Sequence, residues 1–309
     1  MSQFRSGMTL GISSYLIWGM LPLYLALTKP AGALEVLAHR ALWAGLMCLV
    51  ALAFTRGYRA MRAAFADRRT LGVLSVAGVL LTINWFVFVW AATNGHLVDA
   101  ALGYFINPLV SVLLGVVLLG ERLRPAAWVA VGVASCGIVV MGVAIGTFPW
   151  VALALAFSFG LYGFIEKKVG DGIPALVSLT VETLVVAPVL GAYVVWLTVS
   201  GRAAFPGGGL GHSLIMVGLG AATVVPLLLF NGAARRLPLS TLGFVQYLCP
   251  VMQFITGVVI FHEAMSGARW FAFGAVWIAL IILTVSAVWR LRPSARQAQA
   301  ATTGLQPKT

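Results

Sequence analysis

Charged residues are scarce in this sequence of 309 residues: they make up 9% of it, whereas soluble domains carry about 25%. Acidic residues are rarest, with 8 Asp and Glu against 20 Lys and Arg. Apolar residues make up 61%, and the mean hydropathy is +1.00. The long apolar runs lack the alternation of barrel strands, and backbone groups in lipid must be satisfied within each segment. The sequence therefore predicts an all-α membrane protein that crosses the lipid bilayer several times.

Cysteines and enzyme motifs are also sparse. The three cysteines, Cys48, Cys136 and Cys249, lie within apolar runs and form no CxxC, so we interpret them as packing residues. His262-Glu263 would begin an HExxH zinc motif, but Ser266 stands where the second histidine is required. No GxSxG and no GxxxxGK[ST] pattern occurs. We therefore expect no enzymatic activity, no cofactor and no bound metal.

One stretch, LGYFINPLVSVLLGVVLLGE at 102–121, returns later as FVQYLCPVMQFITGVVIFHE at 244–263. The offset is 142 positions without a gap, and the central prolines and terminal glutamates of the two copies coincide. The matched pairs include Pro108 with Pro250, Gly115 with Gly257, Glu121 with Glu263, Trp128 with Trp270 and Leu97 with Leu239. The chain therefore contains an internal repeat of about half its length.

Ten apolar runs have about the 20 residues that a membrane-spanning helix needs. We place them at 8–28, 34–55, 71–92, 98–119, 126–146, 148–165, 174–198, 211–230, 239–261 and 269–290. The connections are short except 56–70 and 199–210. This predicts one five-helix repeat in residues 1–146, a second in 147–292, and a disordered cytoplasmic tail in 293–309.

The basic residues predict how these spans are oriented. With the N-terminus inside, sixteen of the 20 Lys and Arg lie in inside segments, three lie in outside segments, and Arg40 lies within a span. The positive-inside rule then places both termini in the cytoplasm. It also explains the net charge of +12, which in a soluble protein would suggest a nucleic-acid partner. We therefore expect no nucleic-acid binding.

An odd number of spans in each half reverses the second copy, so the two repeats are predicted to be inverted in the membrane. Inverted repeats are typical of secondary transporters, in which two related states give alternating access to a site near the middle of the bilayer. Channels and structural proteins can carry repeats too. Without an ATPase motif, transport would use an ion gradient or the gradient of the solute itself.

Polar residues gather near the two mid-span prolines, where proline should kink or loosen each helix. Tyr104 and Asn107 share a face with Pro108, and Gln246, Pro250 and Gln253 share a face of the later span. Amide side chains disfavour lipid and should point inward, either into a cavity or into hydrogen bonds between helices. The candidates for a substrate cavity are Asn84, Tyr104, Asn107, Pro108, Asn231, Gln246, Tyr247, Pro250 and Gln253.

Among the ionisable residues inside predicted spans, four are candidates for function. Glu182 lies near the centre of span 174–198, where a carboxylate is costly and suggests function. It could carry a coupled proton, bind substrate, or pair with His39 or Arg40. Glu35 opens the second span and shares a face with His39, and Arg40 should have a buried partner. The candidates for an intramembrane charge or coupling role are Glu35, His39, Arg40 and Glu182.

Glu121 and Glu263 end their helices, where a carboxylate opposes the helix dipole. Each is better placed facing the N-terminus of the following helix, and Pro125 fits the first turn of one such helix. We expect a capping or gating role for both glutamates rather than contact with substrate.

The sequence resembles the drug/metabolite transporter superfamily and its ten-helix EamA-type permeases. LLGERL at 118–123 is similar to the end of an EamA repeat, and the later copy has FHE instead. The similarity narrows to the RarD group on YLIWGMLPLYL (15–25), EVLAHRALWA (35–44), NWFVFVWAATNGHLVDAALGYFINPL (84–109), LTVETLVVAP (179–188) and FNGAARRLPLSTLGFVQYLCP (230–250). It covers about residues 7–290.

The resemblance implies export or exchange of small metabolites or drugs across the bacterial inner membrane. It also implies a central cavity lined by the first, third, fourth, sixth, eighth and ninth spans. Glu182, on the seventh span, falls outside that set. We therefore predict a secondary transporter of a small-molecule substrate, with protons as a candidate coupling ion and with substrate, direction and oligomeric state open. The alternatives are a membrane-embedded binding or regulatory protein without transport, and a channel.

Overall fold

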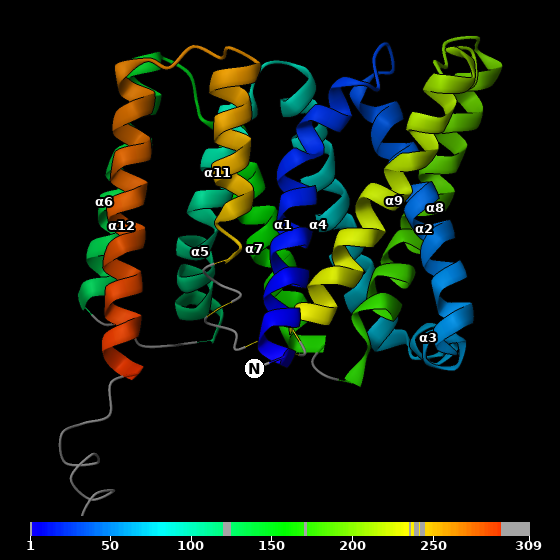
Figure 1. Cartoon of the computed structure of the whole chain (residues 1–309), viewed down its shortest axis with the longest axis horizontal. Coiled ribbons are helices and arrows are strands. Elements are labelled where there is room, and N and C mark those ends of the chain that lie inside the picture. The colour runs from blue at the N-terminus through cyan, green and yellow to red at the C-terminus, as the bar shows by residue number, and fades with distance from the viewer. Residues whose placement is uncertain are drawn as a thin grey trace, which may run out of the picture. The chain divides into compact units, whose positions relative to one another are not determined.

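The computed structural model describes residues 2–119, 125–169, 172–234, 236–237, 241 and 245–291. Within these residues the regular structure is entirely helical, which confirms the predicted class (Figure 1). The helices are α1 (Ser2–Ala26), α2 (Ala33–Thr55), α3 (Tyr58–Ala66), α4 (Arg68–Thr93), α5 (Leu97–Leu119), α6 (Pro125–Ile145), α7 (Trp150–Val169), α8 (Ala175–Val199), α9 (Gly209–Ala234), α11 (Leu248–Ile255), the π-helix η2 (Thr256–Ile260) and α12 (Gly267–Leu291).

Eight of these helices are long and apolar enough to cross a membrane: α1, α2, α4, α5, α6, α8, α9 and α12. Two further apolar helices, Trp150–Glu166 and Leu248–Ile260, are shorter. The predicted ninth span, 239–261, differs from the structure within the described residues, because Gln246 and Tyr247 form a turn before α11, and α11 gives way to η2. The connection 56–70 also differs, since it contains α3.

Helix α3 is a short amphipathic helix that the apolar pattern did not predict. Ala64 is buried on one face, whereas Arg59 and Arg62 are exposed on the other. Such a helix is suited to the boundary between the bilayer and water. It lies at the end of α2 that is on the same side as the chain's N-terminus (Figure 1).

The chain forms two compact units, and each takes segments from both halves of the sequence. The first unit contains residues 1–111 and 149–265, and the second contains residues 112–148 and 266–309. In the second unit, α6 and α12 pack closely. A Cβ atom added to Gly137 would lie only 2.6 Å from the Cβ of Ala275, so the two helices could not approach this closely without a glycine there. Small residues thus bring these two helices together, as is common in membrane proteins.

The first unit is built around α2, which packs against α4, α8 and α9, while α1 packs against α9 and α11. These helices run alongside one another in Figure 1. Glycines allow the closest approaches: a Cβ on Gly78 would lie 2.8 Å from the carbonyl oxygen of Glu182, and one on Gly220 would lie 2.7 Å from the backbone of Trp43. The elements that surround the candidate site are therefore held at short helix–helix distances.

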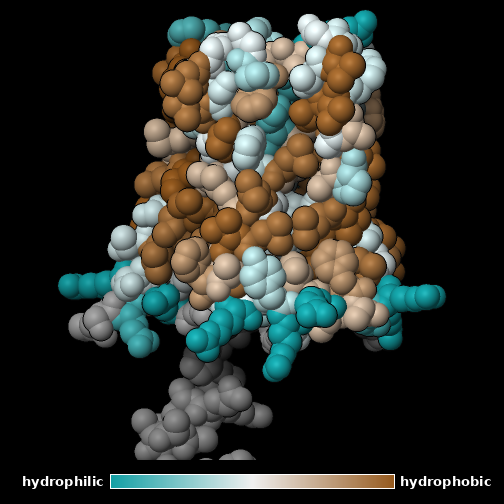
Figure 2. All heavy atoms as spheres, turned by 90° about the vertical axis from the view of Figure 1, so that its right-hand side faces the viewer, coloured by the Kyte–Doolittle hydropathy of each residue, from teal (hydrophilic) through white to brown (hydrophobic). Residues whose placement is uncertain are grey.

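The outer surface of this unit is strongly apolar. Phe54 is 85% exposed and Val189 is 73% exposed, and Figure 2 shows a broad hydrophobic band with hydrophilic side chains along its lower edge. An apolar surface of this extent suits contact with lipid.

Candidate functional site

The first unit contains a cavity of about 1100 Å³ where five helices end. It is bounded by the start of α1, the end of α2, the end of α7, the start of α8 and the end of α9. All five ends lie on the side of the N-terminus (Figure 1). The side chains that line it include the polar groups of Gln3, Thr55, Glu166, Asn231 and Arg236 and the apolar groups of Leu176 and Leu228.

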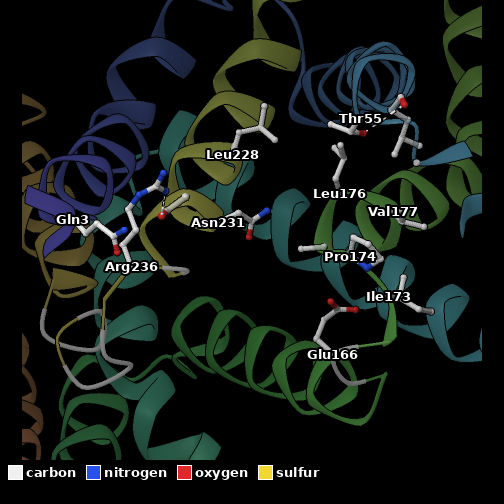
Figure 3. Close-up of a pocket in the computed structure, with 14 residues that line it drawn as sticks. Gln3, Thr55, Glu166, Ile173, Pro174, Leu176, Val177, Leu228, Asn231 and Arg236 are labelled. Atoms are coloured by element: carbon white, nitrogen blue, oxygen red, sulfur yellow. Dashed lines mark hydrogen bonds between the residues drawn. The ribbon is translucent and has the colours of Figure 1, made fainter. Parts of the chain in front are cut away.

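Both polar and apolar side chains line the cavity wall (Figure 3). Asn231 on α9 and Glu166 on α7 point toward the same space from different sides, and Leu228 and Leu176 lie across that space from Glu166. Arg236 donates a hydrogen bond to the carbonyl oxygen of Gly232 at 2.7 Å, which holds its guanidinium at the end of α9. Such a wall can bind a solute that has both an apolar part and hydrogen-bonding groups.

Two carboxyl groups lie next to each other beside this cavity. The Ser178 hydroxyl, in the first turn of α8, donates to Oε1 of Glu166 at 3.0 Å. Glu182 follows one turn later on the same face of α8, 1% exposed, within polar interaction range of Glu166, Tyr162 and Ser178. Neither oxygen of Glu182 makes a hydrogen bond of standard geometry within the described part of the chain.

One alternative for Glu182 was a pair with His39 or Arg40, and no such pair occurs among the described residues. Arg40 instead donates from Nε to the Thr223 hydroxyl at 3.0 Å and lies 4.6 Å from the ring centre of Trp85. His39 Nδ1 accepts from the Trp43 indole at 3.3 Å, and its ring packs on Phe205 at 4.6 Å. Helix α2 directs these groups away from Glu182.

Glu35 has a structural contact at the opposite end of α2 from the cavity. Its Oε1 accepts the backbone N–H groups of Ala204 and Phe205 at 2.8 and 3.0 Å. The carboxylate thereby fixes the connection between α8 and α9. Its predicted role in coupling stays a prediction that no contact in the structure supports.

Asn84 and Tyr104 belong to a buried polar network and do not line the cavity. The Asn84 amide donates to the carbonyl of Leu155 at 3.2 Å and to the Ser158 hydroxyl at 3.1 Å. Its Oδ1 accepts from the Tyr104 hydroxyl at 3.2 Å. This network joins α4, α5 and α7, as hydrogen bonds between membrane helices commonly do. Asn107 is close by in sequence, and its buried Oδ1 has no hydrogen-bond partner among the described residues.

The candidates around α11 do not share one environment. Pro250 and Gln253 are buried, whereas Gln246 is exposed in the turn before α11, so the predicted common face is wrong for Gln246. Gln253 donates to the Cys249 sulfur at 3.2 Å, and Tyr247 stacks on Phe105 with ring centres 6.4 Å apart.

The two prolines also differ. Helix α5 continues on both sides of Pro108, so no interruption occurs there. The boundary between the compact units nevertheless follows at Ser111. Pro250 stands in the first turn of α11, where its missing N–H costs no helical hydrogen bond.

Glu263 caps a helix, but it is not the following one. Its two carboxyl oxygens accept the N–H groups of Leu97 and Val98, the first residues of α5, at 2.6 and 2.9 Å. The predicted capping is therefore seen, with a helix from the other half of the chain as its partner. Glu121 lies outside the described residues, as does the tail 293–309.

Of the residues proposed from sequence, only Asn231 is among those that line the cavity. Sequence reasoning missed Glu166, Gln3 and Thr55. Glu166 directly follows the predicted span 148–165 and precedes Lys167 and Lys168. A carboxylate in the last turn of an otherwise apolar helix was the signal that could have identified it.

Comparison with known proteins shows the family to which the chain belongs. The sequence model of the EamA-like transporter family matches twice, at residues 5–143 and 148–285. Protein RarD of Streptomyces exfoliatus is 45% identical over 298 residues, covering 96% of this chain and 94% of that protein. Protein RarD of Escherichia coli is 36% identical over 294 residues, covering 95% and 99%.

A protein from Pseudomonas aeruginosa named "Chloramphenicol-sensitive protein RarD" is 29% identical over 295 residues, covering 94% of this chain and 97% of that protein. A protein of known crystal structure shares the fold, with a TM-score of 0.60 and 21% identity over 93% of this chain and 99% of that chain. The chain is thus a membrane transporter of the drug/metabolite transporter superfamily, and it belongs to the EamA-like transporter family and to its RarD group.

Proposed function

We propose that this chain is a secondary transporter that moves a small organic metabolite or drug across the bacterial inner membrane by alternating access. The observation that carries the proposal is the cavity of about 1100 Å³ at one end of the first unit. Small-molecule sites commonly measure about 300–1000 Å³ and combine apolar walls with a few polar groups. The cavity lies just above this size range, combines apolar walls with a few polar groups, and lies within a membrane transporter fold.

The cavity faces the cytoplasm in this proposal. Exposed arginines surround the corresponding helix ends in the connection from α2 to α4: Arg56, Arg59, Arg62, Arg68 and Arg69. The positive-inside rule favours a cytoplasmic position for such a group. The double match of the family model supports ten spans in two inverted five-helix repeats, with both termini in the cytoplasm.

The solute path continues from the cavity toward the buried polar groups deeper in the first unit. Asn231 binds the solute near the entrance. Asn84, Tyr104, Asn107 and Gln253 are the candidates further in, because amide and phenol groups can hydrogen-bond to many amphiphilic or zwitterionic solutes. The unpartnered oxygens of Asn107 and Gln253 are available acceptors within the described part of the chain.

Reconstitution of the full chain into proteoliposomes tests the proposal. Labelled chloramphenicol is one probe, because the name of one relative contains the words chloramphenicol-sensitive. A mixture of labelled cellular metabolites is the second probe. Saturable flux that is absent from empty liposomes supports a transporter. Flux that does not saturate would indicate a channel, and binding without flux would indicate a non-transporting protein.

The variant Asn231→Leu tests the cavity itself. It replaces a hydrogen-bonding group with an apolar one of similar size, so the KM for flux should rise while the amount of folded protein stays constant. Asn94→Leu is the matched control, since Asn94 is exposed at the end of α4 and lies outside the cavity. An unchanged KM for Asn231→Leu would place the solute path elsewhere.

A further inference from the structure

Glu182 is the most deeply buried acid in the described part of the chain, on α8. It is 1% exposed, and both of its carboxyl oxygens lack a hydrogen bond of standard geometry there. Burying a charged carboxylate without a compensating charge or hydrogen bond is strongly unfavourable. Something must therefore neutralise this group.

No cation in the described structure does so. From α2, only the Cys48 thiol faces Glu182, and from α7 the facing groups are Tyr162 and Glu166. The Lys168 amine is directed over the ring of Phe164 at 4.7 Å. The charged groups that α3 and α4 contribute are exposed at their helix ends: Arg59, Arg62, Arg68 and Arg69.

Glu166 connects this buried carboxyl to the cavity. It is half-buried, lines the cavity and points into it (Figure 3). The Ser178 hydroxyl holds its Oε1 at 3.0 Å, on the face of α8 that also carries Glu182. The pair thus has one member in contact with the cavity and one member sealed from it.

We propose that Glu166 and Glu182 form the coupling site of the transporter, at which the two carboxyl groups share one exchangeable proton. This inference rests on the proposed function, because coupling has meaning only if a solute is moved. Two carboxylates in contact repel each other when both are charged, and a shared proton removes that repulsion. The proton enters from cavity water at Glu166 and passes to Glu182, which leaves Glu166 charged and Glu182 neutral.

Release of this proton requires the pair to reach water on the opposite side of the membrane in the other state of the transport cycle. One proton bound on one side and released on the other can then drive one step of solute movement. Ser178 is a positioning residue in this scheme, since it touches Glu166 and not the solute path.

Infrared difference spectroscopy on the reconstituted full chain tests the site without any solute. A protonated carboxylic acid has a carbonyl stretching band that a carboxylate lacks. We expect a band of a buried acid that disappears as the buffer is made alkaline. Glu182→Gln, which mimics the neutral acid in shape, should remove this band, and Glu166→Gln should remove it or shift its midpoint.

Asp67→Asn is the matched control, because it makes the same acid-to-amide change at an exposed helix cap and should keep the band. Sodium chloride added at constant pH distinguishes the proton from a metal cation. A band that is lost on adding sodium would overturn the proposal in favour of sodium. A titrating band that persists unchanged in both glutamate variants would also overturn it.

Solute flux then separates the coupling role from the proposed function. In wild type, an imposed pH gradient should drive accumulation, whereas Glu182→Gln should lose that accumulation and keep solute exchange without a gradient. A pH-insensitive wild-type flux would overturn the coupling role while leaving transport intact. Failure of all flux in wild type would overturn the proposed function and, with it, the coupling role, even if the infrared site were confirmed.

Discussion

The carboxylate of Glu263 accepts the backbone N–H of Leu97 at 2.6 Å, although the two residues are 166 positions apart. A second bond reaches Val98 at 2.9 Å, so one side chain satisfies two of the free N–H groups at the start of α5. Gly257 makes this approach possible, since a Cβ there would lie 2.9 Å from a methyl group of Val98. The segment after η2 is thereby tied to the start of α5.

Glu263→Ala should lower the stability of the folded chain by about 2–3 kcal/mol, because hydrogen bonds to a charged group contribute about 1.5–3 kcal/mol. The midpoint of thermal unfolding in detergent measures this loss. His262→Asn is the control, since His262 is exposed with a φ of 54° that Asn also tolerates. Equal midpoints for the Ala variant and wild type would show that the cap does not stabilise the fold.

Gly78 and Gly72 lie on the same helix but should respond differently to alanine. A Cβ at Gly78 would meet the carbonyl oxygen of Glu182 at 2.8 Å and its Cα at 3.0 Å, whereas nothing lies within 4 Å of one at Gly72. Gly78→Ala should therefore cost about 1–3 kcal/mol as α4 and α8 separate. Gly72→Ala should be neutral or stabilise by up to about 1 kcal/mol. The midpoint of thermal unfolding in detergent measures both effects. Similar midpoints for the two variants would contradict the close packing of α4 against α8 at Gly78.

Arg40 should depend on Thr223 for its position. The guanidinium is 4% exposed and uses Nε to bond the Thr223 hydroxyl, so Thr223→Val leaves a buried charged donor unsatisfied. We expect a loss of about 1–3 kcal/mol, measured by thermal unfolding. In Arg40→Met the bond is already absent, so adding Thr223→Val should then cost much less. Additive effects of the two changes would mean that the two side chains do not interact.

Asp67 makes the stability of the α4 N-terminus depend on pH. Hydrogen bonds from the Thr70 side chain, and then from the backbone N–H groups of Thr70 and Arg69, hold the pKa of the Asp67 carboxyl below its ordinary value. A lowered folded-state pKa stabilises the helix start above the unfolded-state pKa, and this contribution is lost as the pH falls through the folded-state pKa.

Asp67→Ala should therefore increase hydrogen exchange of the first turn of α4 at neutral pH and abolish its acid dependence. Asp67→Asn should keep most of the protection, because Asn is an equally good cap, but without the pH dependence. Hydrogen exchange followed by mass spectrometry at neutral and acidic pH measures both effects. Protection in wild type that does not change with pH would contradict the role of the carboxylate.

The all-helical class and most helix positions could be predicted from the sequence, because each apolar run satisfies its own backbone in lipid. The runs for α1, α2, α4, α5, α6, α8, α9 and α12 illustrate this. The prediction was wrong for α3, whose apolar face is too short to give a strong signal. It was also wrong for Gln246 and Tyr247, which form a turn before α11 within the predicted span 239–261.

Asn231 illustrates what sequence could say about the site, since an amide late in an apolar helix must point inward. Glu166 and Glu182 illustrate what it could not say. They lie on α7 and α8, and only the packing of both helices against α4 brings them together beside the cavity. Likewise, the sequence left Arg40 free to pair with Glu182, but the packing of α2 against α9 places its guanidinium against Thr223.

The sequence by itself determined that this chain is a membrane protein and that its segments are helices, because those properties follow from local hydropathy. The tertiary structure decided which helix end Glu263 caps, which groups surround Glu182 and where the cavity lies. These depend on contacts between segments more than a hundred residues apart, which no local pattern encodes.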